Sequence, residues 1–233
     1  MRPITNPNKL TVEIFRDEKT PDVTIDPVIT ALGGLSRIVD SFEIIRADRT
    51  IKVADESQTI DMHKIVWRRA RADITVAMTD RPIYDYKKKV DVRGASFIMP
   101  DKYSRLGFRE AIISSQGGAT TEEVTEHEIG HILNVKSFGD KSDGEGHCLD
   151  EDCVMYYSTV PKVTQSSPEK LGEKIKATFG RFKAETMVSY DRRKLCAECA
   201  PQLGSSAFML LEAKRGKFVP DSIVFPDRLR IFS

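Results

Sequence analysis

The sequence predicts an α+β fold in which helices pack on a mixed, twisted β-sheet. Two observations lead to this prediction. In the N-terminal half, short segments with the apolar alternation of strands are interspersed with segments whose apolar residues have helical spacing. A well-capped helix follows them near residues 121–133. Elements in this order bury their apolar faces against one another in a layered domain.

Six strands are predicted, each rich in β-branched or aromatic residues. A turn at Asp48-Arg49 would separate the second strand from the third, and Asp80-Arg81-Pro82 would turn the chain after the fourth. The strand at residues 94–99 is our candidate for an exposed sheet edge, and an ordinary interior strand is the alternative. The six predicted strands are residues 10–15, 42–45, 50–53, 74–78, 94–99 and 111–114.

Two helices are predicted before the capped one. Asp26-Pro27 resembles an N-cap followed by N1, and apolar residues from Val28 to Ile38 follow at helical spacing, with Gly33-Gly34 inside. A second helix is predicted at residues 58–72, where Ile60, His63, Trp67 and Ala70 lie near one face. His63 has no partner at ligand spacing, and we interpret it as a structural or surface residue.

Length and charge exclude several classes of protein. A chain of 233 residues can build one large domain or two subdomains without needing disulfides. A net charge of +1 indicates an ordinary surface rather than a nucleic-acid-binding one. The first ten residues lack the apolar core of a signal peptide, and no apolar run is long enough to span a bilayer. We therefore expect a protein without a membrane partner.

The run His127-Glu128-Ile129-Gly130-His131 carries the clearest chemistry. On a helix, His127 and His131 lie one turn apart on the same face, so both imidazoles can reach one metal ion. Glu128 lies close enough to act as a general base on a water at that metal. Thr120 or Thr121 can cap the helix, and Asn134 suits a left-handed stop. This is the geometry of a zinc hydrolase.

All four cysteines of the chain have metal-ligand spacing. Cys148 and Cys153 form a C-x4-C pair, and Cys196 and Cys199 form a C-x2-C pair. Four thiolates with such spacing predict a closed tetrahedral zinc site, and disulfides are the less favoured alternative. In a chain with no recognisable signal peptide, this cysteine usage predicts a cytoplasmic location.

Together these motifs resemble the archaemetzincin branch of the metzincin metallopeptidases. The resemblance rests on His-Glu-x-x-His, a tight helix stop, a third His beside a Cys, Cys-x4-Cys-x-Met and a later Cys-x2-Cys, over about residues 121–199. The chain departs from the family where Asn134 replaces a Gly and Ser137 replaces the third His. His147 then follows an insertion at residues 136–146, which we interpret as a polar flap. The gap between Met155 and Cys196 is also longer than in the family.

The resemblance implies a role for each of these residues. His127, His131 and His147 would hold a catalytic zinc, with Glu128 as general base and Met155 in a turn beneath the metal. Tyr157 would approach the zinc and the oxyanion, unless it is an ordinary packed aromatic. A second, structural zinc would be held by Cys148, Cys153, Cys196 and Cys199, giving two Zn²⁺ per chain. The implied activity is hydrolysis of a peptide or protein substrate, in the narrower form as an aminopeptidase, with the substrate paired to an edge strand.

The C-terminal part, residues 136–233, would form one subdomain and residues 1–135 the other, within one catalytic domain. Ser167-Pro168 opens a predicted long basic helix toward Tyr190, whose charged face we interpret as solvated. Residues 208–211 and 223–225 are apolar enough to pack back on the body.

Two other functions fit the same residues. In a gluzincin-like zinc hydrolase, Glu169 or Glu173 on a helix would replace His147 as third ligand. In a non-catalytic, zinc-stabilised binding module, the metals would only support the fold. The presence of Glu128 argues against the module, because a scaffold needs no general base.

Overall fold

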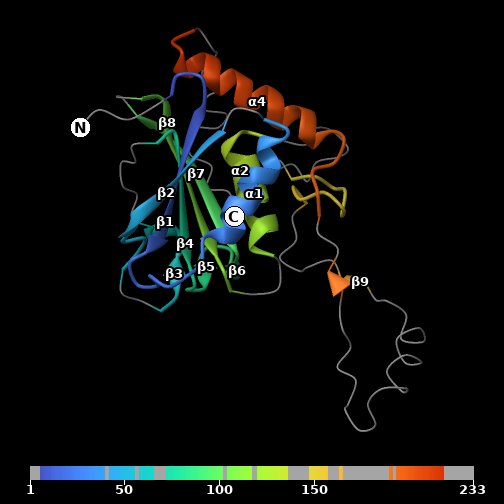
Figure 1. The fold of residues 1–233 in the computed structure, drawn as a ribbon. Coiled ribbons are helices and arrows are strands. Elements are labelled where there is room, and N and C mark those ends of the chain that lie inside the picture. Colours follow the sequence, from blue (N-terminus) through green and yellow to red (C-terminus); the bar gives the residue numbers. More distant parts are fainter. Residues whose placement is uncertain are drawn as a thin grey trace, which may run out of the picture.

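The computed structural model describes residues 6–39, 42–55, 58–65, 72–101, 104–116, 120–135, 147–156, 163–164, 189–190 and 193–217. Its main sheet has five strands in the order β2-β1-β4-β8-β7 (Figure 1). The first four pair in parallel and β7 pairs antiparallel to β8, so the predicted mixed sheet is confirmed. Residues 94–99 belong to a strand at the edge of the sheet, which is the candidate position and excludes the interior alternative. The five strands are β2 (Phe42–Ile51), β1 (Leu10–Asp17), β4 (Ile74–Thr79), β8 (Ser104–Ser114) and β7 (Gly94–Asp101).

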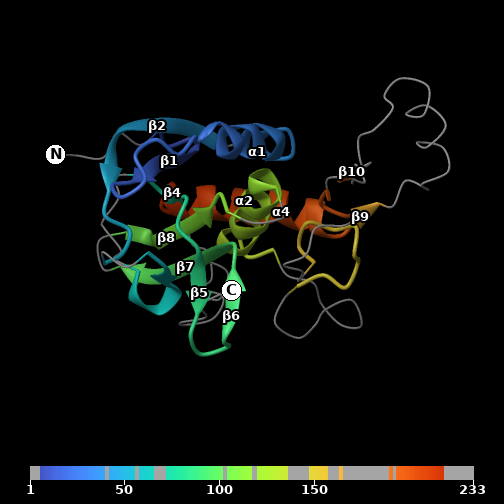
Figure 2. The same cartoon turned by 90° about the horizontal axis from the view of Figure 1, so that it is seen from below.

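In the described part of the chain, three helices cover one face of this sheet, as Figures 1 and 2 show from two directions. They are α1 (Asp26–Ser36), α2 (Thr121–Ile132) and α4 (Cys199–Lys214). The first confirms its prediction, because Pro27 stands in its first turn and Val28, Leu32 and Leu35 are buried in the common core. Since α2 packs against α1, β7 and β8, it lies between α1 and the edge strand.

The opposite face carries a second, smaller core, and here one helix prediction is wrong. Residues 58–65 form β3 (Ile60–Asp61) and a 3-10 turn at Met62–Lys64, while residues 66–71 lie outside the described part. The amide of Ile60 donates to the carbonyl of Pro82 (2.8 Å), and Ile60 pairs in parallel with Ile83. The apolar spacing was therefore that of a buried strand end and a short turn.

The same small sheet contains a hairpin that the sequence did not reveal. Its strands are β5 (Ile83–Asp85) and β6 (Val90–Val92), and it leads directly into β7. At only three residues, each strand is too short for a clear alternation of apolar and polar residues.

A second correction concerns residues 42–53, predicted as two strands about a turn. Residues 42–51 form the single strand β2, because both halves pair with β1: Ile14 pairs with Arg46 before the predicted turn, and Arg16 pairs with Thr50 after it. The residues at the predicted turn instead form an irregularity within the strand. Local turn propensity gives way to parallel pairing with a largely buried neighbour.

The C-terminal helix α4 was also not foreseen from the sequence. Leu210 and Leu211 pack in the main core, as expected for residues 208–211, whereas Phe208 is 56% exposed. An ion pair between Lys214 and Asp73 (2.6 Å) fixes the end of α4 to the residue before β4.

Several C-terminal predictions fall beyond the described residues. Residues 223–225 and most of the predicted basic helix lie outside them. At the end of that helix prediction, Ser189–Tyr190 form the strand β10, which pairs with β9 (Val163–Thr164). The division at residues 135 and 136 stays a prediction. None of the described helices is long and apolar enough to cross a membrane.

Candidate metal centre

Helix α2 begins and ends as its sequence predicts. The hydroxyl of Thr120 accepts a hydrogen bond from the amide of Glu123 (3.2 Å), and Glu122 and Glu123 place negative charge in the first turn. Asn134 has a φ of 58°, and its amide donates to the carbonyl of His131 (2.9 Å). A left-handed residue there reverses the chain immediately after the second His of the motif.

Three imidazoles meet beside α2. The ring centroids of His127 and His131 are 4.6 Å apart, and that of His147 lies 5.5 Å from the first and 5.0 Å from the second. One ring nitrogen from each lies within 4.8 Å of those of the other two. His147 is 2% exposed, so the chain returns after residues 136–146 to bury this third imidazole against the helix. Sequence alone left the choice of third ligand open.

A backbone carbonyl sets the orientation of His127. The Nδ1–H of His127 donates to the carbonyl oxygen of Val154 (2.7 Å), and because a carbonyl only accepts, Nδ1 carries the proton. The lone pair of Nε2 is therefore directed toward Nε2 of His131, which lies 2.9 Å away. Such a hydrogen bond from the remote nitrogen typically holds a metal-binding imidazole in place. Nothing in the local sequence predicted this contact.

Glu128 lies buried between α2 and the edge strand. Its side chain is 4% exposed, and burial raises the pKa of Glu128 to about 8, while an interaction with the Ser96 hydroxyl opposes that rise. Among the described residues, Oε2 of Glu128 has no hydrogen-bond partner. In its ionised form, which a nearby cation would favour, a carboxylate oxygen of this kind is suited to receive a proton from a small molecule.

Gly94, the first residue of β7, makes room for Glu128. A Cβ at this position would lie 2.7 Å from Cγ and 2.8 Å from Oε1 of Glu128, and 2.8 Å from Cγ1 of Val124. The absence of a side chain thus allows β7 and α2 to approach closely. Gly94 marked only the start of a strand in the sequence, and its role depends on a contact between distant segments.

Met155 lies directly beneath the helix. It is fully buried, and a Cβ at Gly130 would meet its Sδ closer than two atoms can approach. The Gly inside the His-Glu-x-x-His run therefore accommodates this side chain. Tyr157, predicted near the metal, lies outside the described residues, as do Glu169, Glu173 and residues 136–146.

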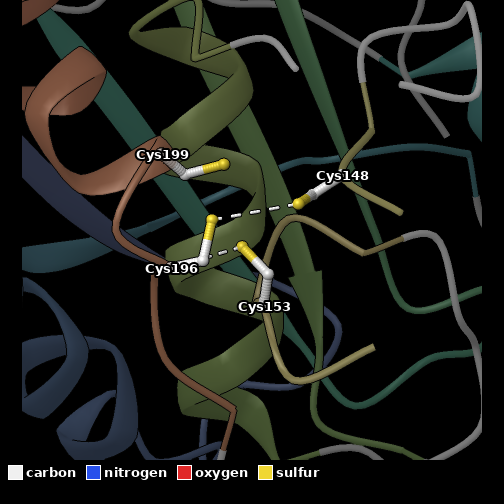
Figure 3. A group of neighbouring side chains, drawn as sticks. All are labelled: Cys148, Cys153, Cys196 and Cys199. Atoms are coloured by element: carbon white, nitrogen blue, oxygen red, sulfur yellow. Dashed lines mark hydrogen bonds between the residues drawn. The ribbon is translucent and has the colours of Figure 1, made fainter. Parts of the chain in front are cut away.

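The four cysteines form a second cluster nearby. Figure 3 shows their side chains pointing toward one another, two from each of two segments. Their sulfur atoms all lie within 4.8 Å of one another, and all four are free thiols. Sγ of Cys148 and Sγ of Cys196 are 3.9 Å apart, close to the separation of about 3.8 Å that Zn–S bonds of about 2.3 Å impose in a tetrahedron.

Backbone contacts join these two segments. The amide of Cys196 donates to Sγ of Cys153 (3.5 Å), and the amide of Val154 donates to the carbonyl of Lys194 (3.0 Å). Hydrogen bonding from the Cys199 side chain, together with the amides of Cys196 and Met155, lowers the pKa of Cys153 to about 5 against the opposing effect of burial. A thiolate is thus favoured, which is the form that binds zinc.

The two clusters share one short stretch of chain. Cys148 follows His147 directly, and its amide donates to the carbonyl of Met155 (2.9 Å). Val154, which orients His127, stands between Cys153 and Met155. Anything that displaces the four sulfur atoms should therefore disturb the three imidazoles.

Comparison with solved structures shows the same architecture. No family model and no curated protein matches the sequence. Among solved structures, the archaemetzincin from Methanopyrus kandleri aligns with a TM-score of 0.54 and 12% identity, over 87% of this chain and 98% of that one. The archaemetzincin from Archaeoglobus fulgidus has a TM-score of 0.48 and 18% identity, over 83% of this chain and 99% of that one. Metalloproteinase-II from Bacteroides fragilis has a TM-score of 0.38 and 15% identity, over 64% and 46%. The alignment with the Methanopyrus kandleri structure shows that the chain has the fold of an archaemetzincin.

Proposed function

We propose that the protein is a zinc metallopeptidase that hydrolyses peptide bonds, with Glu128 as general base. One observation carries the proposal: His147, from a separate segment, is buried against the two imidazoles of α2, and one ring nitrogen from each of the three lies within 4.8 Å of the others. Three imidazole ligands, together with a carboxylate on the helix that carries two of them, are a usual protein contribution to a hydrolytic zinc site.

The residues present fit a zinc ion. All three donors are nitrogen ligands of the type zinc prefers, and the tautomer fixed by Val154 leaves Nε2 of His127 unprotonated, which is the form that binds a metal. When bound, zinc supplies a Lewis acid that lowers the pKa of a water molecule and polarises a carbonyl group. His127, His131 and His147 would hold it.

Glu128 would move the proton. Its Oε2 would take a proton from the attacking water and pass it to the nitrogen of the departing amine. The close approach of β7 at Gly94 and the interaction with Ser96 hold this carboxylate in position. Met155 would keep the underside of the site apolar and dry.

The edge strand β7 offers a way to bind an extended substrate. It pairs with β8 on one side and ends the five-stranded sheet, so its other side can accept main-chain hydrogen bonds from a peptide. Because Gly94 touches Glu128, a peptide aligned along β7 would pass beside the general base. An aminopeptidase mode is the narrower form of this proposal.

The four cysteines would hold a second zinc, which makes two per chain. With four thiolates the coordination is closed, so this metal would stabilise the fold and take no part in chemistry. It would fix the segment that carries His147, Val154 and Met155 to the start of α4.

Zinc analysis beside peptide hydrolysis tests the proposal. The native protein and Glu128→Gln should each contain about two zinc per chain, while hydrolysis should fall by about 10²- to 10⁴-fold in the variant. Equal hydrolysis by both proteins would contradict the role of Glu128. One zinc per chain, held by thiolates alone, would favour the non-catalytic binding module.

The gluzincin-like alternative differs in its third ligand. If Glu169 or Glu173 held the metal, His147→Ala should retain the catalytic zinc, whereas our proposal expects its loss. The burial of His147 beside His127 and His131 favours the latter.

A further inference from the structure

A short hairpin stands immediately before the edge strand, and its tip is strongly exposed. We define the basic hairpin as residues 83–92, made of β5, a turn and β6 (Figure 2). Its root is buried, with Ile83 1% and Val92 4% exposed in the smaller core, whereas all residues from Tyr86 to Asp91 are exposed. A buried root with an exposed tip indicates a projecting element anchored in the body.

The turn at the tip has a defined backbone conformation. The buried carboxylate of Asp85 accepts hydrogen bonds from the amides of Lys87 (2.8 Å) and Lys88 (3.1 Å). The amide of Lys89 donates to the carbonyl of Asp85 (2.7 Å), and Lys89 has a φ of 59°. The lysines are thus presented on an ordered turn, which lowers the entropic cost of binding a partner.

The exposed tip combines positive charge with apolar surface. Lys87 and Lys89 form no ion pair within the described parts of the chain, and Asp91 is the single exposed acid of the tip. Tyr86 is 57% and Val90 37% exposed, although a large aromatic side chain is usually more buried. The ring of Tyr86 packs edge-on against Tyr84, with centroids 4.7 Å apart. This combination suits a partner with carboxylates next to apolar groups.

The basic hairpin adjoins β7, the strand along which we propose that the substrate binds. Only Arg93 separates β6 from Gly94, and Arg93 is fixed at Ser114 by two hydrogen bonds: its carbonyl accepts from the Ser114 amide (2.8 Å), and its Nη2 donates to the Ser114 carbonyl (3.2 Å). Five residue steps separate Lys89 from Gly94, so at about 3.3 Å per residue the lysine lies within roughly 17 Å of the point where β7 meets Glu128. An extended peptide covers that distance with about five residues.

We propose that the basic hairpin binds acidic side chains of the peptide substrate, about five residues from the bond that is cut. The inference rests on the proposed function and assigns a substrate class to the same site. A nucleic acid is a less suitable partner, because the charge is confined to one small tip on a chain of net charge +1. Acidic peptides would therefore be preferred over neutral ones of the same length.

Two fluorescent twelve-residue peptides provide the test. They are identical except that one carries three glutamates where the other carries three glutamines, placed on both sides of the central bond. Binding is measured by fluorescence anisotropy with Glu128→Gln protein, and hydrolysis is measured with protein that retains Glu128. At low salt we expect the glutamate peptide to bind and react about 10-fold better, and this ratio should approach one at high salt.

Charge reversal on the hairpin should remove the preference. In Lys87→Glu with Lys89→Glu, the ratio should fall to about one or below, and Lys87→Gln with Lys89→Gln should give an intermediate value. The matched control is Lys9→Glu with Arg37→Glu. It changes the net charge by the same amount as the hairpin variant, at positions before β1 and after α1. The control should keep the preference of the native chain.

The outcomes separate the two proposals. If protein with Glu128 cuts both peptides equally and the hairpin variants change nothing, the hairpin inference is wrong and the peptidase proposal stands. If no peptide is cut but the hairpin variants abolish selective binding of the glutamate peptide, the peptidase proposal fails and the hairpin still binds acidic peptides. Displacement of the glutamate peptide by a duplex oligonucleotide or by anionic vesicles at lower concentration than by unlabelled peptide would overturn the inference.

Discussion

Sδ of Met155 lies directly against the backbone of Gly130, in the last turn of α2, with no space for a Cβ between them. In the sequence, Gly130 lies between the two histidines of the helix. Met155 follows Val154, whose carbonyl oxygen orients one of them, His127. The helix and the Met-containing turn are therefore fitted to each other at the level of single atoms.

Gly130→Ala should disrupt this fit. Ala favours a helix over Gly by about 1 kcal/mol, yet the added methyl must displace a fully buried side chain, which typically costs about 1–3 kcal/mol. We expect a lower free energy of unfolding in urea and a lower zinc content. Gly33→Ala in α1 is the control, because its Cβ would meet nothing within 4 Å, and it should be neutral or stabilising. Equal stability changes in both variants would contradict the packing argument.

Gly94→Ala should affect the reaction more than the metal. Its Cβ would lie 2.7 Å from Cγ of Glu128 and push the carboxylate away from its position, and a displacement of about 1 Å can lower a rate about 100-fold. We expect kcat to fall by about 10- to 100-fold while the zinc content stays unchanged. Gly204→Ala, where the nearest atom is a carbonyl oxygen at 3.7 Å, serves as the control. Loss of zinc with unchanged kcat per bound zinc would refute this explanation.

Cys196→Ser should lower both zinc content and activity. The Cys cluster holds the segment in which Cys148 follows His147, so loss of its metal should also move the third imidazole. Metal analysis should show the loss of at least one zinc per chain, with activity reduced in proportion or more. Lys194→Gln, exposed in the same segment, should leave both unchanged. Full retention of zinc and activity in Cys196→Ser would show that the two clusters are independent.

Glu110 on β8 should make stability depend on pH. It is 4% exposed, and burial raises its pKa to about 8, so between about pH 4.3 and pH 8 the folded protein holds a proton that the unfolded chain releases. The free energy of unfolding should therefore fall as the pH rises through this window. Glu110→Gln removes this dependence and should be more stable than the native chain at pH 9, by an amount on the order of a few kcal/mol.

Urea unfolding at pH 5, 7 and 9 would measure the difference in the free energy of unfolding between Glu110→Gln and the native chain. It should be largest at pH 9 and small at pH 5, where the native carboxyl group already carries its proton. Asp22→Asn, at an exposed position, should show no such trend. A constant difference across the three pH values would be inconsistent with a buried, protonated Glu110.

The sequence by itself determined the features that depend on neighbours a few residues apart. Thr120 caps α2, Asn134 ends it in a left-handed conformation, and the spacing of four places His127 beside His131, all as predicted. The edge position of β7 was one of two alternatives in the sequence. Residues 58–65 and residues 42–53 were misassigned, because pairing of Ile60 with Ile83 and of β2 with β1 outweighed local propensity.

Only the tertiary structure decided which distant groups meet at the site. It brought His147 to the two imidazoles of α2, the carbonyl of Val154 to His127 and the open space of Gly94 to Glu128. A backbone carbonyl and a missing side chain carry no signature in a residue pattern, since their effect arises from what lies opposite them. Residue spacing fixes local geometry, whereas contacts between distant segments are fixed only when the whole chain has packed.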